Sequence, residues 1–278
     1  MTIDTVDKLV SAMGNNSSRL IIDKASIANA ATGQFHSLWR ATGQPGQGAI
    51  PGAVAVPDHT TTGAIGFTQQ TSPATSYLAI LEGLCSNAGT TLEIHDRLAH
   101  MGGLVGNITT TQIVDLDLNT LTANNVVARR GAADYSDVTW WLEWYTDTGA
   151  TATTVTVNVT YNDGSTGNLT AISIAATRRA SFMIPLNGYI PAADAGKFIR
   201  EVNAVALAAT TGTAGSFGVT ATRYRGALYL PVVYARFTSD WVGLGLPEIP
   251  NSACLFPIQL AGTTSTGIVR ATGKIVHG

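Results

Sequence analysis

Charged residues are scarce in this chain. Of its 278 residues 12% are charged, the formal net charge is −2, and the charges are scattered rather than gathered in blocks. A surface that binds nucleic acid or anionic lipid is typically a basic patch. The sequence therefore predicts no specific nucleic-acid partner and no membrane partner. A long helical bundle is also disfavoured, because it would contain more Glu, Lys and Leu.

Cysteine and long apolar runs are scarce too. Cys85 and Cys254 lie far apart without metal-ligand or redox spacing, which favours two small buried side chains over a disulfide. No apolar stretch is long enough to span a bilayer. The first ten residues carry Asp4 and Asp7 and lack the basic start and apolar run of a signal peptide. We therefore expect synthesis in a cytoplasm.

Thr, Asn, Ser and Gln carry the polarity of the chain, and 29 Gly supply turns, a composition that suits many short strands. From Ile108 onward apolar and polar residues alternate with a period of two. We expect a mainly β fold, an antiparallel sandwich of jelly-roll type with an N-terminal helix, an extended arm and a C-terminal hairpin. The predicted parts are 1–107 (helix, arm and mixed segment), 108–225 (sandwich) and 226–278 (extension with the hairpin).

Three hairpins are predicted within the β-rich part. Alternation over 154–161 stops at Asn162-Asp163-Gly164-Ser165, a strong turn sequence, and resumes over 170–174. The other two hairpins would join 199–209 to 217–224, and 254–260 to 267–276.

The first hundred residues have a different pattern. An apolar helical face predicts a helix over 3–13, formed by Ile3, Val6, Leu9, Val10 and Met13. The segment 41–70 is rich in Gly and Pro and predicts an extended arm that is mobile until a partner binds it. Short helices are expected over 77–84 and 96–101, with an extended stretch at 92–95 between them.

Titratable residues form few clusters. His95, Asp96 and His100 are the densest group. They fit either a hydrolase site or structural residues, and no set of residues with metal-ligand spacing accompanies them. Asp115 and Asp117 share one face of a strand, which fits a solvated face better than a calcium site. The motifs of the common enzyme classes are missing. We expect a protein that is not an enzyme, with no catalytic residues, cofactor or metal.

Aromatic residues gather on one predicted strand. Trp141, Glu143 and Tyr145 point to one side, opposite Trp140 and Trp144. This side fits a surface that binds another protein or stacks on a sugar, or else a sheet covered on both faces. The predicted partner-binding residues are Ile3, Val6, Leu9, Trp141, Glu143 and Tyr145.

Arginines occur in pairs at Arg129-Arg130, at Arg178-Arg179 and at Arg223 with Arg225. We interpret them as hydrogen-bonding groups between subunits, since arginine is enriched at interfaces.

Four stretches resemble a family of tailed-bacteriophage proteins that are described as structural or hypothetical proteins. They are Ile94-His95-Asp96-Arg97-Leu98-Ala99-His100-Met101-Gly102-Gly103-Leu104, Trp141-Leu142-Glu143-Trp144-Tyr145-Thr146-Asp147-Thr148-Gly149, Gly212-Thr213-Ala214-Gly215-Ser216-Phe217-Gly218-Val219-Thr220, and Gly243-Leu244-Gly245-Leu246-Pro247 leading into Ala253-Cys254-Leu255.

The resemblance implies a component of the virion and leaves its position in the particle open. We expect a capsid decoration or cement protein that binds itself, as a homotrimer, and the major capsid protein or other virion proteins. The alternative is a tail or vertex adhesin that binds host glycans through Trp141 and Tyr145. The pieces are turns and packing residues, so they carry no catalytic constellation.

Overall fold

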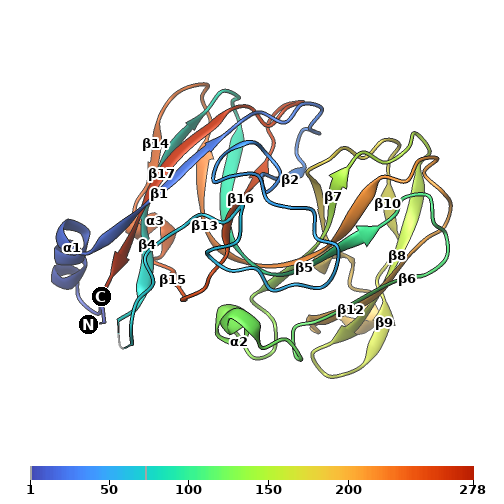
Figure 1. Ribbon diagram of the computed structural model, residues 1–278, viewed down its shortest axis with the longest axis horizontal. Helices are drawn as coiled ribbons and strands as arrows, with labels where there is room; N and C mark the ends of the chain where they lie inside the picture. Colours follow the sequence, from blue (N-terminus) through green and yellow to red (C-terminus); the bar gives the residue numbers. More distant parts are fainter. Residues whose placement is uncertain (1, 73) are drawn as a thin grey trace. The chain divides into compact units, whose positions relative to one another are not determined.

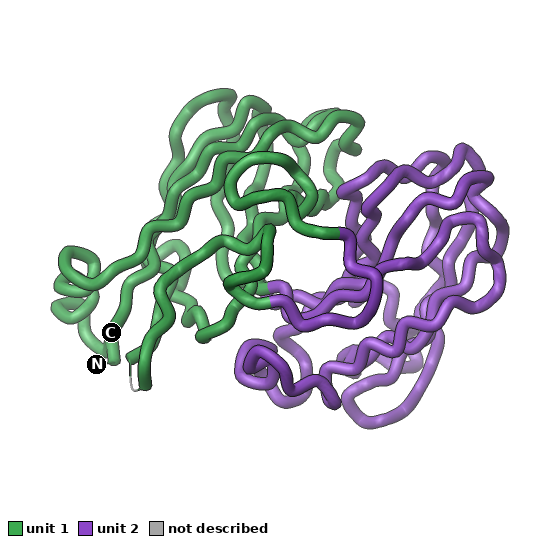
Figure 2. Tube along the Cα trace, in the orientation of Figure 1, with its two compact units in different colours: residues 1–49, 58–96, 224–278 green, residues 50–57, 97–223 purple. Residues whose placement is uncertain are grey.

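The computed structural model describes residues 2–72 and 74–278, and the chain divides into two compact units. Unit 1 comprises Met1–Ala49, Asp58–Asp96 and Tyr224–Gly278, and unit 2 comprises Ile50–Pro57 and Arg97–Arg223 (Figure 2). Each unit therefore combines segments that are far apart in the sequence. The predicted division at residues 107 and 225 concerns domains and stays a prediction.

Unit 1 contains an antiparallel sheet in which one C-terminal strand lies between two strands from the first third of the chain (Figure 1). Leu20 and Ile22 face the core, whereas Arg19, Ile21 and Asp23 are exposed, as the two-residue period of a strand requires. In order, the sheet contains β14 (Phe237–Ser239), β4 (Ser76–Cys85), β17 (Val269–His277), β1 (Ser17–Lys24) and β3 (Gly43–Gln44), with β15 (Glu248–Ile249) also paired to β4.

A second group of strands completes unit 1. The strand β16 (Leu255–Leu260) pairs with β2 (Phe35–Ser37) and with the first part of β5 (Thr90–Leu104). Side chains from both groups meet in one core, which is the arrangement of a sandwich. The core includes Leu20, Ile22, Leu81, Leu92, Ile94, Leu255 and Ile275.

Unit 2 has a corresponding organisation. Its larger sheet has the order β10 (Ile172–Ile174), β8 (Thr153–Tyr161), β12 (Ile199–Leu207) and β6 (Gln112–Asp117), with β9 (Thr166–Asn168) also on β8. Its second group places β7 (Val138–Thr146) between β11 (Phe182–Pro185) and β13 (Ser216–Leu230). The Trp140 Nε1 donates to the carbonyl of Ile199 over 2.8 Å and so links β7 to β12.

Helices are short. The N-terminal helix α1 begins after Thr5, whose hydroxyl accepts from the Lys8 amide, and it buries Leu9 and Ala12. None of the helices within 2–72 and 74–278 is long and apolar enough to cross a bilayer. The helices are α1 (Val6–Asn15), α2 (Val126–Arg129) and α3 (Trp241–Leu244), with 3-10 turns η1 (Ala123–Asn125), η2 (Asn187–Tyr189) and η3 (Ala192–Asp194). The predicted mainly β, antiparallel, sandwich-like fold with an N-terminal helix is confirmed.

Two predicted helices are strands. The residues of 77–84 lie in β4, where the register shifts between Lys274 and Ile275 of the paired strand. The irregularity puts Leu78 and Leu81 in the same core although they are three residues apart, so the spacing imitates a helix. Residues 96–101 lie in β5 and are almost all buried, and a strand covered on both faces loses its alternation.

One of the three predicted hairpins is confirmed. Strand β8 pairs with β9 and β10 across the turn at 162–165, where Asp163 Oδ1 accepts from the Ser165 amide and Gly164 has a φ of 83°. The other two are wrong. β12 pairs with β6 and β8, whereas β13 pairs with β7; β16 pairs with β2 and β5, whereas β17 pairs with β1 and β4. In both cases consecutive strands join different sets of partners, as crossed connections of sandwiches do.

The predicted arm packs on its own chain. Within unit 1, Ala41 and Ile65 belong to the core, and the buried Lys24 ammonium donates to the carbonyls of Ala41 and Pro45 over 3.0 and 2.7 Å. Within unit 2, Ala55 and His100 exchange two backbone hydrogen bonds. The glycines and prolines prevent regular strands, but side chains satisfy the freed carbonyls. The expectation of a segment without partners in its own subunit is therefore wrong.

Candidate functional site

Both faces of β7 are buried. Trp141, Glu143 and Tyr145, predicted to contact a partner, are 2%, 0% and 3% exposed. The Trp141 Nε1 donates to Thr222 Oγ1 over 2.8 Å. On the opposite face, the ring of Trp144 stacks on Phe217 with 5.6 Å between centroids. The interpretation of a sheet covered on both faces is confirmed, and β7 offers no surface for a sugar or a protein.

The carboxylate on this strand belongs to a buried ionic network. The Arg97 guanidinium donates to both oxygens of Glu143, over 3.2 and 2.6 Å. It also donates to Tyr145 Oη and Thr220 Oγ1, each over 3.1 Å. Burial, and next the charge of Glu143, raise the pKa of the Tyr145 phenol. A bidentate ion pair that is shielded from water holds its two side chains in one geometry. We therefore interpret the pair of Arg97 and Glu143 as a structural element.

The residues of the predicted titratable cluster have different partners in the fold. His95 Nε2 lies 2.8 Å from Glu93 Oε2. Asp96 forms a buried ion pair with Arg225 over 3.2 Å and accepts from the Cys254 amide over 2.9 Å. The carboxylate of Asp96 thus links β5 to β13 and to Cys254, the residue before β16, inside unit 1, which is a structural role. No group of three His, Cys, Asp or Glu able to hold a metal occurs among the described residues.

His100 is held neutral in the fold. Its Nδ1 accepts from Arg97 Nε over 2.7 Å, and it is 7% exposed. Burial, and next the charge of Arg97, lower the pKa of His100 from 6.5 to about 2. A neutral imidazole that accepts from a guanidinium is fixed in one tautomer, which is a structural arrangement.

Acid should destabilise the protein through His100. The unfolded chain binds a proton below pH 6.5, but the folded chain does not until about pH 2, so the folded state loses stability as the pH falls through this window. We expect a contribution of about 1.4 kcal/mol per pH unit. Urea unfolding at a series of pH values measures how the free energy of unfolding changes with pH. In His100→Gln, which keeps an acceptor for Arg97, this slope should be smaller by the contribution of one bound proton. An unchanged slope would contradict the assignment.

Asp115 and Asp117 lie on β6 opposite the buried Val114 and Leu116. Asp115 is exposed, and Asp117 Oδ1 accepts from the Asn119 amide over 2.8 Å. Arg200 Nε lies 3.4 Å from the same oxygen. These contacts agree with a solvated strand face.

The arginine pairs mostly bind their own chain. The buried Arg129 donates to the carbonyls of Pro57 and Arg97 over 2.8 and 2.7 Å, and the buried Arg225 pairs with Asp96. For these two arginines the prediction of contacts between subunits is wrong. Arg179 lies on the surface in an ion pair with its own chain, and an intersubunit role for it stays a prediction.

The three predicted contact residues of the N-terminal helix differ in exposure. Leu9 is buried against Ala79 and Val276, and Ile3 packs beside them. Val6 is 57% exposed, and so is Val10 at 62%, one helical turn further. Only part of the apolar face of α1 is therefore covered by unit 1, and we call Val6 and Val10 the α1 face.

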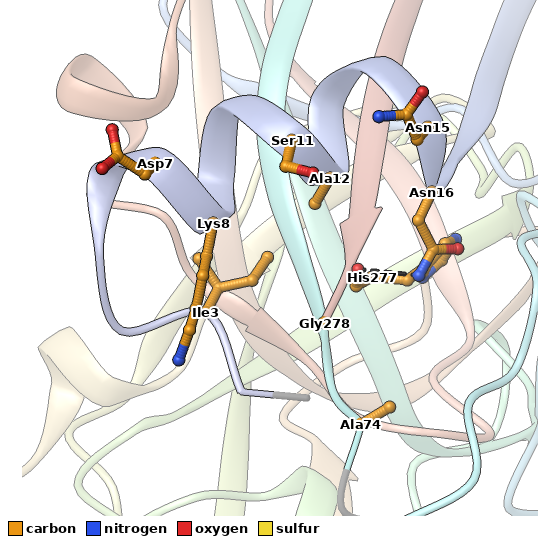
Figure 3. Close-up of a pocket in the computed structure, with 10 residues that line it drawn as sticks. All are labelled: Ile3, Asp7, Lys8, Ser11, Ala12, Asn15, Asn16, Ala74, His277 and Gly278. Carbon is orange, nitrogen blue, oxygen red and sulfur yellow. Dashed lines mark hydrogen bonds between the residues drawn. The ribbon is translucent and has the colours of Figure 1, made fainter.

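A cavity of about 390 Å³ lies between α1 and the end of β17 (Figure 3). Among the residues that line the cavity, His277 contacts Ser18 Oγ at 2.7 Å and Ser76 Oγ at 2.9 Å through its two ring nitrogens. The Asn16 amide donates to the carbonyl of His277 over 2.9 Å. Burial lowers the pKa of His277. These contacts join Asn16, the residue after α1, to β17 and give His277 a structural role.

The sequence reasoning missed an apolar surface at the other end of unit 1. The connection from β13 to β14 exposes Val232, Val233 and Tyr234 by 53%, 46% and 62%, and Ile268 is exposed beside them. The Tyr234 amide donates to the Cys85 carbonyl over 2.8 Å, and Ser86 exchanges backbone and side-chain bonds with Ile268. We call these four residues the tip patch. The consecutive apolar residues after Pro231 were the available signal.

Comparison with known proteins gives no identification. No model of a protein family matches the chain, and no curated protein matches it. Among solved structures, the chain is similar to a chain in the structure of the infectious bursal disease virus Gt strain. The two are 10% identical, the match covers 94% of this chain and 82% of that chain, and the TM-score is 0.20. The VP2 subviral particle of the same virus gives 9% identity, 94% and 79% coverage, and a TM-score of 0.16. TM-scores this low support no inference.

Proposed function

We propose that this chain is a non-enzymatic structural component of a virion, specifically of a tailed bacteriophage. The observation that carries the proposal is the contrast between interior and surface in unit 1 and unit 2. Inside, the charged groups of the candidate sites are engaged in structural pairs, such as Arg97 with Glu143 and Arg225 with Asp96. On the surface, unit 1 exposes large apolar side chains in the tip patch and the α1 face.

Exposed apolar groups of this kind mark surfaces for other proteins. Val232, Val233 and Tyr234 are consecutive, and none of them contributes to the core of unit 1. A sandwich that exposes apolar side chains suits a protein that functions by binding other protein chains. The resemblance of four stretches to structural proteins of tailed phages supports the same role.

Within the particle we propose a capsid decoration or cement protein, a homotrimer that binds the major capsid protein. Because the segment 41–70 packs on its own chain, attachment would use the folded surface of the sandwich and its terminal helix rather than a free arm. A tail or vertex adhesin that stacks sugars on Trp141 and Tyr145 is not retained, because both rings are buried.

Mass spectrometry of purified particles tests the role, and cryo-EM locates the chain. We expect it in intact virions at hundreds of copies, a number set by the symmetry of an icosahedral shell. A dozen copies or fewer would instead indicate the tail or a vertex and would reject the decoration role. Absence of the chain from purified virions would reject the proposal as a whole.

A further inference from the structure

The two exposed apolar surfaces of unit 1 lie at opposite ends of one sheet. In β17, His277 pairs with Ser76 at the end where α1 precedes β1, and Val269 pairs with Cys85 at the end where the tip patch is anchored. Figure 1 shows α1 at one end of β1 and β17. A strand of the length of β17, nine residues, spans about 30 Å. The α1 face therefore cannot reach the tip patch of its own chain.

The α1 face is apolar with an acidic border. Val6 and Val10 are one turn apart, so their side chains are neighbours on the helix surface. Asp4 and Asp7 are both exposed beside them. Lys8, the one cation within α1, is in an ion pair with Asp4 over 2.7 Å, so no cation of the helix is left to balance the negative charge of Asp7.

The tip patch is apolar with an arginine border. Arg236 and Arg270 follow the patch residues Tyr234 and Ile268 by two positions each, and their side chains are 65% and 64% exposed. Each contacts one carboxylate, Glu82 or Asp23, through a single nitrogen, and a guanidinium has five N–H donors. The patch itself is held in place by the backbone bond from Tyr234 to Cys85. It is thus preorganised, which reduces the entropy lost on binding.

We propose that the α1 face of one copy docks on the tip patch of a second copy. The valines of α1 would cover Val232, Val233 and Tyr234, while Asp4 and Asp7 would meet Arg236 and Arg270. The inference rests on the proposed role in assembly and names the partner as the chain itself. Because two different surfaces meet, the contact is head-to-tail. Such a contact closes into a ring, as in a trimer, or continues as an open chain.

Mixing two variants tests this arrangement. Val10→Lys spoils the α1 face and keeps the tip patch, whereas Val233→Lys spoils the tip patch and keeps the α1 face. Both side chains are exposed, so each variant should keep the wild-type thermal midpoint. Sedimentation velocity should show self-association weakened about tenfold or more in each variant alone, as for a central interface residue. An equal mixture should form dimers, because one intact pair of surfaces remains.

The control is Ile113→Lys, which places the same charge at an exposed position of unit 2, 60% exposed and outside both surfaces. It should associate like the wild type. Variants that associate normally, or a mixture that gives no dimers, would overturn the head-to-tail contact, since an isologous contact is not restored by mixing.

The two proposals can fail separately. A wild-type chain that is monomeric at every concentration tested, yet present in purified virions, would overturn the self-contact and leave the structural role standing. A chain that associates as expected but is absent from virions would overturn the structural role alone.

Discussion

A chain that lacks residues 1–70 is expected to be insoluble or unfolded. The deletion removes β1 and β2, so β17 and β16 each lose a paired strand. It also removes Leu20, Ile22 and Leu38 from the core of unit 1. Emptying one such position typically costs about 2–5 kcal/mol, and the stability of a whole protein is about 5–15 kcal/mol. Three such losses amount to about 6–15 kcal/mol, which is as large as the whole stability before the lost pairing of β17 and β16 is counted.

Solubility after expression and the far-ultraviolet circular dichroism spectrum measure this result. The matched control removes only residues 1–15, which carry α1 and contribute Leu9 and Ala12 to a small separate cluster. That shorter deletion should leave a soluble β protein with a lower thermal midpoint. If the longer deletion remained soluble with an unchanged midpoint, the segment 1–70 would be a dispensable arm and the position of β1 in the sheet would be wrong.

Replacing Glu143 by Leu is expected to lower the free energy of unfolding by about 3–5 kcal/mol. The reason is that Arg97 is completely buried and would keep its charge without the carboxylate that now holds it at 2.6 Å. Urea denaturation measures the loss. The double variant Arg97→Met/Glu143→Leu should lose less than the single variant, because no isolated charge remains in the interior.

An exposed ion pair supplies the comparison. Arg179 and Asp147 are 2.6 Å apart, but their side chains are 42% and 46% exposed. Arg179→Met should therefore change the free energy of unfolding by no more than about 1 kcal/mol. An effect of Glu143→Leu as small as that of Arg179→Met would mean that water reaches Arg97, and the closed network would have to be abandoned.

Residue types alone indicate some of the contacts and the burial that the structure shows. The lack of ligand spacing around His95 and His100 favoured a structural role, which agrees with their contacts to Glu93 and Arg97. Cys85 and Cys254 are both free and buried, as two isolated apolar cysteines are expected to be. The tip patch was missed because exposure depends on which neighbours cover a residue, and three apolar residues in a row fit a buried strand equally well.

The aromatic strand shows where one-dimensional patterns stop being informative. Alternation correctly separated Trp140 and Trp144 from Trp141 and Tyr145, since successive side chains of a strand point to opposite faces. It did not indicate whether the second face is covered. That depends on strands such as β5 and β13, whose residues lie far from β7 in the sequence.

The sequence by itself determined the local features of this protein: the mainly β character, the helix at the N-terminus, and the hairpin around Asn162–Ser165. Each depends on interactions between residues close in the chain, namely side-chain periodicity, a capping hydroxyl and turn geometry. Only the tertiary structure decided which strands pair, that 41–70 packs on its own chain, and that the acidic group of β7 is buried against Arg97. These features depend on contacts between residues far apart in the sequence. Many apolar strands could pair with one another about equally well, and only the burial of all strands together selects one arrangement.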